Sequence, residues 1–241
     1  MSTLGILGGL GPMASVYFYE LLTAHTRATC DQDHIDLLIS SRASTPDRTA
    51  FILGKSPCNP APVMAQEAER LVRAGADLLA IPCNTAHTFY ETVQSATNVP
   101  VLNIIRLTAA YCQSLGISRV GVLATEGTVA SGAYKTELDK HGIAYRIPDA
   151  DGQRALMDII YGQIKRGLVP DVDRFLSVAD GLFADGCERV ILACTELSLL
   201  KRDFLRDPRF IDSMEVLALA AIRRTGKEPV GFDDELMRFQ P

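Results

Sequence analysis

Short apolar runs alternate along the chain with longer segments in which apolar residues recur every three or four positions. The runs predict strands at Leu4–Leu7, Leu37–Ser40, Leu78–Ile81, Val101–Leu102, Val120–Leu123, Ala144–Ile147 and Val190–Ala193. The longer segments predict helices at Pro12–Ala28, Pro62–Arg73, Thr88–Ser95, Leu107–Ser114, Ala133–Lys140, Gln153–Lys165, Val172–Ala184 and Glu215–Arg224. This alternation is typical of βαβ units, so we expect an α/β fold in which helices cover both faces of a mainly parallel sheet.

A weak internal repeat divides the chain. Residues 74–85 read AGADLLAIPCNT and residues 184–195 read ADGCERVILACT, so each copy has a helix end, a glycine, a strand and a cysteine followed closely by threonine. The two cysteines are 111 positions apart, close to half of the chain. The repeat favours two similar halves that face each other across a cleft, with a boundary near Asn98–Arg106. Several similar helix–glycine–strand units can also occur in an α/β protein without such symmetry.

The composition excludes several classes of partner. The 241 residues are 47% hydrophobic, which is enough apolar material for one sizeable core or for two smaller lobes. The formal net charge of -5 gives no support to nucleic-acid or membrane-surface binding. No stretch approaches the roughly 18 consecutive apolar residues of a membrane span, and the first nine residues lack the features of a secretion signal. We therefore expect a cytoplasmic protein.

The chain has six cysteines, and no two of them have Cys-x-x-Cys spacing. A zinc knuckle or a thioredoxin-like motif is therefore not expected. A cytosol would keep the thiols reduced, and most of them are expected to fill the core.

Two cysteines stand where a predicted strand ends and a helix begins, Cys83 in the motif PCNTAH and Cys194 in the motif ACTEL. Free backbone amides at a helix N-terminus favour an anion, and a thiol there can have a pKa below its usual value of about 8.5. Short side-chain donors for a carboxylate ligand stand beside them at Asn84, Thr85 and Thr195. Glu196 could bond an ammonium group or simply cap the helix. Each motif by itself is equally compatible with a buried structural cysteine.

Two thiols that face one small substrate from opposite sides fit the inversion of a carbon stereocentre. One group removes a proton, the other delivers a proton to the opposite face, and the two exchange roles in the reverse direction. Proton transfer of this kind contributes about 10²–10⁴-fold for each positioned group. Backbone amides behind the two cysteines could stabilise the carbanion-like transition state.

Further polar positions follow other predicted strands. The glycine loop Gly8–Pro12 allows a close approach of the backbone to an anion, although it lacks the third glycine of a dinucleotide-binding fingerprint. Arg48, in a polar loop, can bind a carboxylate through two hydrogen bonds or be an ordinary surface arginine. Lys165 can reach the cleft or complement a helix end. Thr128 could reach the cleft, and His87 is expected to support the first cysteine from behind rather than act as a base.

With these motifs the chain resembles the aspartate/glutamate racemase family, from Leu4 to about Arg224. The resemblance rests on GGLGP at 8–12, PCNTAH at 82–87 and ACTEL at 193–197. It implies an α/β fold of two pseudosymmetric lobes, each a mainly parallel four-stranded sheet flanked by helices, with the active site in the cleft between them. It also implies that residues 1–100 plus 209–241 form the first lobe and residues 101–208 the second. The resemblance further implies that the protein uses no pyridoxal phosphate or metal, acts on a small amino-acid substrate and is usually a homodimer.

The resemblance also assigns roles to residues. The family's acid/base cysteines correspond to Cys83 and Cys194, as in the branch that turns over both enantiomers. Its carboxylate-binding positions correspond to Leu10 through its backbone, with Gly11 beside it, and to Asn84, Thr85, Thr195 and Glu196. Its basic residues for a side-chain carboxylate correspond to Arg48 and Lys165. We therefore expect an isomerase that interconverts L- and D-aspartate, or glutamate, without a cofactor.

Two departures from the family pattern concern the shape of the pocket. Leu10 stands where methionine is commoner, and Ala193 adds a methyl group where glycine is commoner. The alternatives left open are a maleate-isomerase-like or hydantoin-racemase-like enzyme and a non-catalytic dicarboxylate-binding protein. An arylmalonate-decarboxylase-like activity is disfavoured because that branch has one active cysteine. A binding protein is disfavoured because it would need neither of the two cysteines.

Overall fold

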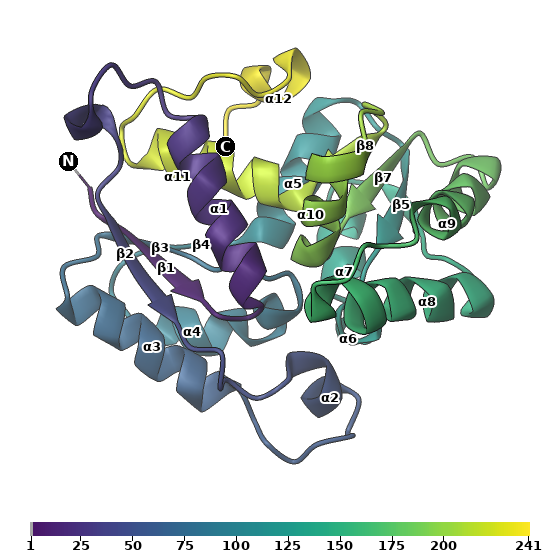
Figure 1. Ribbon diagram of the computed structural model, residues 1–241, viewed down its shortest axis with the longest axis horizontal. Coiled ribbons are helices and arrows are strands. Elements are labelled where there is room, and N and C mark those ends of the chain that lie inside the picture. The colour runs from purple at the N-terminus through teal and green to yellow at the C-terminus, as the bar shows by residue number, and fades with distance from the viewer. Residues whose placement is uncertain (1) are drawn as a thin grey trace.

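The computed structural model describes residues 2–241 as two four-stranded, all-parallel sheets flanked by helices (Figure 1). The first sheet has the strand order β2-β1-β3-β4, with β1 at Leu4–Gly8, β2 at Leu37–Ser41, β3 at Leu78–Ala80 and β4 at Val101–Leu102. The second has the order β6-β5-β7-β8, with β5 at Arg119–Leu123, β6 at Ala144–Arg146, β7 at Arg189–Leu192 and β8 at Phe210–Asp212. The predicted fold class is therefore confirmed.

The two sheets repeat one connection pattern, and each has a glycine at an equivalent close contact. A Cβ atom on Gly5 of β1 would lie 3.3 Å from Leu71 and only 2.5 Å from Leu79. A Cβ atom on Gly121 of β5 would lie 2.9 Å from Leu182. A flanking helix thus presses on the first strand of each sheet where no side chain intervenes. The internal repeat seen in the sequence extends to this packing.

Helices cover both faces of each sheet. Around the first sheet they are α1 (Pro12–Ala24) and α11 (Ser213–Arg224) on one face, and α3 (Ala61–Arg73) and α4 (Tyr90–Ser95) on the other (Figure 1). Around the second sheet they are α5 (Ile104–Ser114), α7 (Ala133–Lys140), α8 (Ala150–Met157), α9 (Val172–Ala184) and α10 (Thr195–Phe204). No helix in residues 2–241 combines the length and the apolar character that crossing a bilayer requires.

The largest hydrophobic cluster joins the two sheets. It contains Ile6 of β1 and Val122 of β5, together with Ile105 of α5 and Leu217 of α11, and all four side chains are buried. Because α5 and α11 pack against each other, they connect the two halves through one apolar layer. This shared layer fixes how the strand ends of the two sheets face each other.

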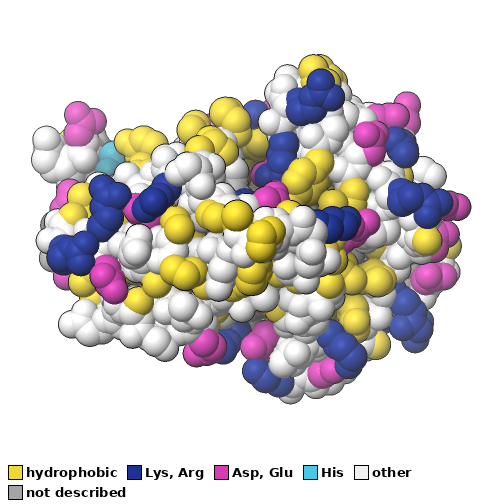
Figure 2. Space-filling view, turned by 90° about the horizontal axis from the view of Figure 1, so that it is seen from below, with side chains coloured by type: hydrophobic (Ala, Val, Ile, Leu, Met, Phe, Trp, Pro, Cys, Tyr) yellow, Lys and Arg dark blue, Asp and Glu magenta, His cyan; other side chains and the backbone are white. Residues whose placement is uncertain are grey.

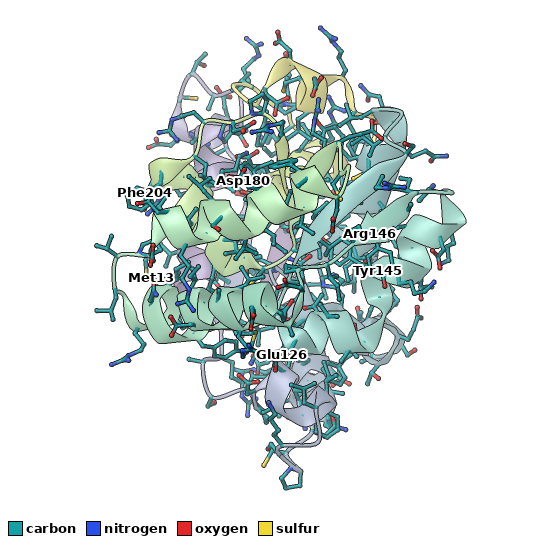
Figure 3. The ribbon with its side chains drawn as sticks, turned by 90° about the vertical axis from the view of Figure 1, so that its right-hand side faces the viewer. Met13, Glu126, Tyr145, Arg146, Asp180 and Phe204 are labelled. Atoms are coloured by element: carbon teal, nitrogen blue, oxygen red, sulfur yellow. The ribbon has the colours of Figure 1, made fainter. Side chains whose placement is uncertain are left out.

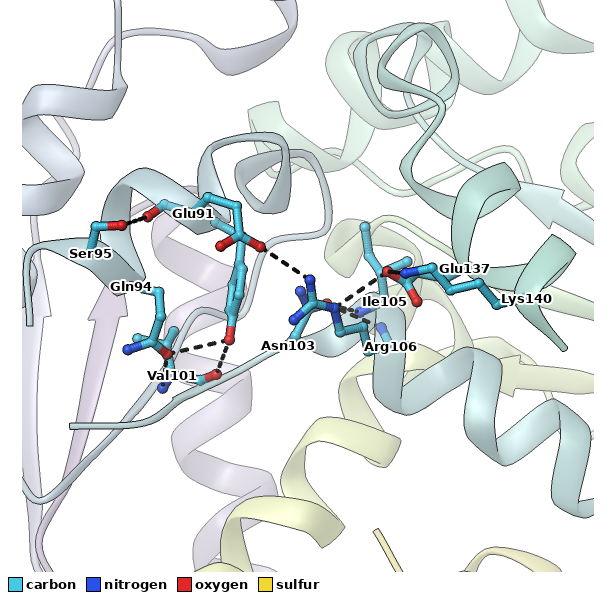
Figure 4. A network of polar contacts seen from close by, with 10 residues as sticks. Glu91, Gln94, Ser95, Val101, Asn103, Ile105, Arg106, Glu137 and Lys140 are labelled. Atoms are coloured by element: carbon cyan, nitrogen blue, oxygen red, sulfur yellow. Dashed lines mark hydrogen bonds and ion pairs between the residues drawn. The ribbon is translucent and has the colours of Figure 1, made fainter. Parts of the chain in front are cut away.

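An ion-pair network also crosses between the halves, at the predicted boundary. Arg106 of α5 donates to Glu91 of α4 at 3.1 Å and to Glu137 of α7 at 3.3 Å (Figure 4). The guanidinium also lies 4.8 Å from the ring centre of Tyr90. Arg106 therefore links one helix of each half. On the face shown in Figure 2, basic and acidic side chains are interspersed rather than gathered into a basic surface.

The strand pairing differs from the predicted lobe limits at two short strands. Val101–Leu102 pairs with β3 in the first sheet, and Phe210–Asp212 pairs with β7 in the second. Each predicted limit would separate one of these strands from its neighbour. The chain then returns to the first half, where His25 Nδ1 lies 2.8 Å from the Val230 carbonyl oxygen. The division into lobes otherwise stays a prediction.

Several short elements were not predicted. They are β8, α2 (Arg48–Ile52), α6 (Glu126–Ser131), α12 (Asp234–Arg238) and the 3₁₀ turns η1 (Asp31–Asp33) and η2 (Thr85–Phe89). The helix α10 was expected only as a helix start. The predicted helix Gln153–Lys165 is wrong in its second half, because α8 is followed by the π-helical segment η3 (Asp158–Gln163) and the 3₁₀ turn η4 (Ile164–Arg166). A π-helical turn inside a helix is common near functional sites.

Candidate active site

A small cavity lies where the carboxyl ends of β3 and β7 face each other. Nine of the predicted site residues line it, namely Leu10, Arg48, Cys83, Asn84, Thr85, Lys165, Cys194, Thr195 and Glu196. Three unpredicted residues, Thr49, Thr125 and Tyr161, complete the lining. Ligands of parallel α/β folds bind at the carboxyl ends of strands, so this cavity is the candidate active site.

The loop after β3 is fixed by a neutral histidine. Cys83 is 6% exposed, and its carbonyl oxygen lies 2.8 Å from His87 Nδ1. The Ile104 amide donates to His87 Nε2 at 3.2 Å, so the ring proton is on Nδ1 and is donated to Cys83. Burial lowers the pKa of His87, which keeps the ring uncharged. His87 therefore supports the cysteine loop from behind, as its position in the sequence suggested.

The loop after β7 places a thiol against a carboxylate. Cys194 is 5% exposed, precedes the first turn of α10, and its Sγ donates to Glu196 Oε2 at 3.0 Å. Burial and the Glu196 carboxylate raise the pKa of Cys194 well above the usual value, and Lys165 offsets this only in part. The expectation that the helix N-terminus lowers the thiol pKa is wrong at Cys194, because these two effects are larger.

Lys165 forms an ion pair with Glu196 inside the cavity. Its ammonium also lies 5.3 Å from the ring centre of Tyr161, which stands four positions earlier in the chain. Burial acts to lower the pKa of Lys165, but the charge and the hydrogen bond of Glu196 act to raise it, and the net effect is a raised pKa, so the ammonium stays charged. Lys165 thus lies in the site, as predicted, and is already paired with Glu196.

Gly11 does not line the cavity, yet it touches this ion pair. A Cβ atom at Gly11 would lie 2.8 Å from Glu196 Oε1 and 3.6 Å from Lys165 Nζ. Any larger residue would displace the carboxylate. The glycine loop after β1 therefore leaves space for the Glu196 carboxylate, because Gly11 has no side chain.

Arg48 is the first residue of α2 rather than a loop residue. Its guanidinium donates to the carbonyl oxygens of Leu10 at 2.7 Å and Pro46 at 3.1 Å. Arg48 Nε is buried and has no hydrogen-bond partner among residues 2–241. The arginine is therefore held in place by two loops, while its side chain lines the cavity.

Four threonine hydroxyls connect the two halves beside the cavity. Thr85 Oγ1 lies 2.8 Å from Thr128 Oγ1 and 3.0 Å from Thr125 Oγ1, and Thr49 Oγ1 donates to Thr125 at 3.3 Å. The predicted role of Thr128 is corrected here: it lies on α6 and holds Thr85 and Thr125 without lining the cavity. A Cβ atom on Gly127 would lie 2.7 Å from Thr49 Cα, so α2 packs directly on α6 and closes this side.

The Asn84 side chain also spans the two halves. Its amide nitrogen donates to Ser213 Oγ at 3.0 Å, and its oxygen accepts from the Tyr134 hydroxyl at 2.7 Å. Ser213 in turn donates to the carbonyl oxygen of Leu192 at 2.8 Å. The amide expected to bind a carboxylate is thus already engaged in holding β3 and β7 together.

Sequence reasoning missed Thr49, Thr125 and Tyr161 because isolated threonines and tyrosines carry no distinctive signal. Tyr161 was accessible in principle, since a residue four positions before Lys165 shares its helical face. Thr49 could also have been considered, since it directly follows Arg48, which was predicted. Within residues 2–241, no three His, Cys, Asp or Glu side chains are grouped so as to hold a metal ion.

Comparisons with known proteins agree with this architecture. The profile of the Asp/Glu/Hydantoin racemase family matches residues 7–221. The broad specificity amino-acid racemase RacX of Bacillus subtilis (strain 168) is 26% identical over 223 residues, which cover 91% of this chain and 96% of RacX. The structure of Picrophilus torridus aspartate racemase matches with a TM-score of 0.83 at 30% identity, covering 95% of this chain and 96% of that one. An aspartate racemase homologue from Pyrococcus horikoshii OT3 matches with a TM-score of 0.76 at 26% identity, covering 94% and 100%.

The fold is that of the racemases, which are isomerases that invert a stereocentre. The chain belongs to the Asp/Glu/hydantoin racemase family. Both the family and the enzyme class expected from the three motifs are therefore confirmed.

Proposed function

We propose that this protein interconverts L- and D-aspartate without a cofactor, with glutamate as the second candidate substrate. The observation that carries the proposal is that Cys83 and Cys194 line one small cavity from the ends of β3 and β7. Arg48 and Lys165 line the same cavity and suit a substrate with a second carboxylate. The names of the relatives, an aspartate racemase and a broad specificity amino-acid racemase, support the same substrate class.

In the proposed mechanism the two thiols act on opposite sides of the substrate Cα atom. Cys194 begins as the acid, because its thiol donates to Glu196 in the resting site. Cys83, as the thiolate, removes the Cα proton, and the electron pair is delocalised into the substrate carboxylate. Cys194 then delivers its proton to the other face, and the roles are reversed for the other enantiomer.

The resting ion pair suggests how the substrate binds. A zwitterion can replace the Lys165–Glu196 contact by two new ones, its ammonium with Glu196 and a carboxylate with Lys165. The guanidinium of Arg48, which lines the same cavity, then receives the other carboxylate. Engaging Glu196 with the ammonium also weakens its effect on Cys194, so substrate binding lowers the pKa of that thiol towards its working range.

Chiral chromatography of dialysed enzyme with separate L-amino acids tests the proposal. We expect D-aspartate to form faster than any other D-amino acid, with D-glutamate as the second product. Preferred turnover of a monocarboxylic amino acid would contradict the substrate assignment, and no inversion of any amino acid at high enzyme concentration would contradict the function.

We further propose that the protein is a cytoplasmic homodimer. The outward face of α1 carries Met13, Val16 and Tyr19, which are 57%, 56% and 49% exposed and recur every three residues. Met13 and Phe204, which is 47% exposed, project from the same side of the molecule (Figure 3). Light scattering should give a dimer for the wild type and a monomer for Val16→Lys, and a dimeric Val16→Lys would place the interface elsewhere. The free, exposed Cys30 and Cys58 suit a reducing compartment.

A further inference from the structure

A chain of three hydrogen bonds joins the two cysteine loops. The Tyr134 hydroxyl of α7 donates to Asn84 Oδ1 at 2.7 Å, and Asn84 Nδ2 donates to Ser213 Oγ at 3.0 Å. Ser213 Oγ in turn donates to the carbonyl oxygen of Leu192 at 2.8 Å. Tyr134 and Ser213 belong to none of the motifs that mark the site in the sequence.

The ends of this chain lie next to the two cysteines. Asn84 directly follows Cys83, and Leu192 is the last residue of β7, two positions before Cys194. Tyr134 itself stands outside the lining of the cavity. The same three side chains therefore connect the backbone at one thiol to the backbone at the other.

The direction of the bonds fixes the orientation of the Asn84 amide. A backbone carbonyl oxygen can only accept, so the Ser213 hydroxyl gives its one proton to Leu192. Ser213 Oγ then has to accept from Asn84, and only the amide nitrogen can provide that proton. The amide oxygen therefore faces Tyr134 and accepts the phenol proton. A turned amide would break the bond to Tyr134 or the bond to Leu192.

All three side chains are shielded from water. Tyr134, Asn84 and Ser213 are 3%, 2% and 0% exposed. Burial raises the pKa of Tyr134, so the hydroxyl keeps the proton that it donates. A buried amide oxygen that loses its donor is costly, so without this hydroxyl the amide would shift towards a new partner.

The ring of Tyr134 is held by the apolar layer that joins the two sheets. It belongs to the same hydrophobic cluster as Val122 of β5 and Leu217 of α11. The hydroxyl therefore has a fixed place relative to the second sheet, and through Asn84 it acts on the loop that follows β3 of the first sheet.

We propose that Tyr134 is a positioning residue for the two thiols. Through Asn84 and Ser213 it sets the place of the Cys83 loop relative to β7, and hence the separation of the two sulfur atoms across the substrate Cα atom. This role rests on the proposed function, in which both thiols act on one carbon. A displacement of about 1 Å between reacting groups can cost about 100-fold in rate.

Steady-state racemisation of L-aspartate by Tyr134→Phe tests this role, because the variant keeps the ring and removes only the hydroxyl. We expect kcat to fall by about 10–100-fold at nearly unchanged KM, because Arg48 and Lys165, which are proposed to bind the carboxylates, are held by other contacts. Tyr111→Phe, at another buried tyrosine, whose ring packs on Phe239, is the matched control and should keep the wild-type kcat. An unchanged kcat in Tyr134→Phe, or a rise in KM alone, would overturn the proposal.

The double variant Tyr134→Phe/Ser213→Ala separates positioning from two independent structural defects. Both hydroxyls act through Asn84, so their effects on kcat should not multiply, and the double variant should have the kcat of the slower single variant. Effects that multiply would mean that the two hydroxyls act separately, which would overturn the proposed chain.

The side-chain amide of Asn84 gives a readout that needs no turnover. In ¹H–¹⁵N NMR spectra we expect its signals to shift in Tyr134→Phe and to exchange faster with solvent than in the wild type or in Tyr111→Phe. Unchanged Asn84 signals in Tyr134→Phe would overturn the positioning role while leaving the proposed function intact. A wild-type protein that inverts no amino acid would instead overturn the proposed function, and the catalytic role of Tyr134 with it, whether or not the Asn84 signals shift.

Discussion

The loops that follow β3 and β7 hold equivalent positions in the two sheets but surround their cysteines differently. Two positions after Cys83 stands Thr85, whose hydroxyl belongs to an uncharged threonine cluster. Two positions after Cys194 stands Glu196, whose carboxylate accepts the thiol proton at 3.0 Å. The side chain at this position of the repeat is therefore an uncharged hydroxyl in one loop and a carboxylate in the other.

The helices behind the two cysteines differ as well. Cys83 is followed by the 3₁₀ turn η2, which His87 holds in place, whereas Cys194 directly precedes the ten-residue helix α10. The longer helix alone would favour an anion at Cys194. Burial and the Glu196 carboxylate nevertheless raise the pKa of that thiol. A repeated scaffold thus positions the two thiols, while single side chains set where their protons reside.

The largest expected effect comes from removing either thiol. Cys83→Ser and Cys194→Ser should each lower kcat by about 10²–10⁴-fold, because a hydroxyl is a far weaker base than a thiolate. Cys58→Ser, at an exposed cysteine, is the matched control and should retain full activity. Chiral chromatography of aspartate measures the rates, and a fully active Cys83→Ser or Cys194→Ser would remove that residue from the mechanism.

The next effect concerns the side-chain carboxylate of the substrate. Arg48→Ala should lower kcat/KM for aspartate by about 10–100-fold, since a charged hydrogen bond is lost. Turnover of alanine, if it occurs in the wild type, should change far less. An equal loss for both substrates would mean that Arg48 only holds the Leu10 loop.

A smaller effect separates the two cysteines directly. Glu196→Gln should lower the pKa of Cys194, because the carboxylate charge and its hydrogen bond both raise it. The pH dependence of Cys194 alkylation in a Cys83→Ser background should therefore move towards lower pH, while burial still holds the pKa above its usual value. A shift towards higher pH would contradict the account of this environment.

The smallest effect is expected from Thr85, in the loop after β3. Thr85→Val removes one hydroxyl from the threonine cluster and should cost about 1 kcal/mol of unfolding free energy. Its effect on kcat should be smaller than that of Glu196→Gln. Denaturant unfolding and aspartate turnover measure the two quantities. A larger loss of kcat in Thr85→Val than in Glu196→Gln would mean that the loop after β3 contributes more to catalysis than the loop after β7, which would contradict this prediction.

The sequence pattern predicted the larger elements because their apolar runs and helical periods are long. It missed β8 and α2, which have three and five residues, because such short elements depend on neighbours distant in the chain. The strand β8 is an edge strand that pairs with β7.

The site was predicted where a motif marked it and missed where only tertiary contacts do. Cys83 and Cys194 stand out through their repeat, whereas Thr128 was misplaced because its distance from the cavity depends on α6, a helix of six residues. The engaged side chain of Asn84 could not be foreseen either, since its partners Tyr134 and Ser213 lie 50 and 129 positions away.

The most direct test of two separate proton-transfer groups is racemisation of L-aspartate in deuterium oxide, followed by NMR of both enantiomers at early times. The two-thiol account predicts that newly formed D-aspartate carries deuterium at Cα while the remaining L-aspartate keeps its original proton. Deuterium that enters the remaining L-aspartate as fast as D-aspartate forms would mean that one group serves both faces, which would contradict the account.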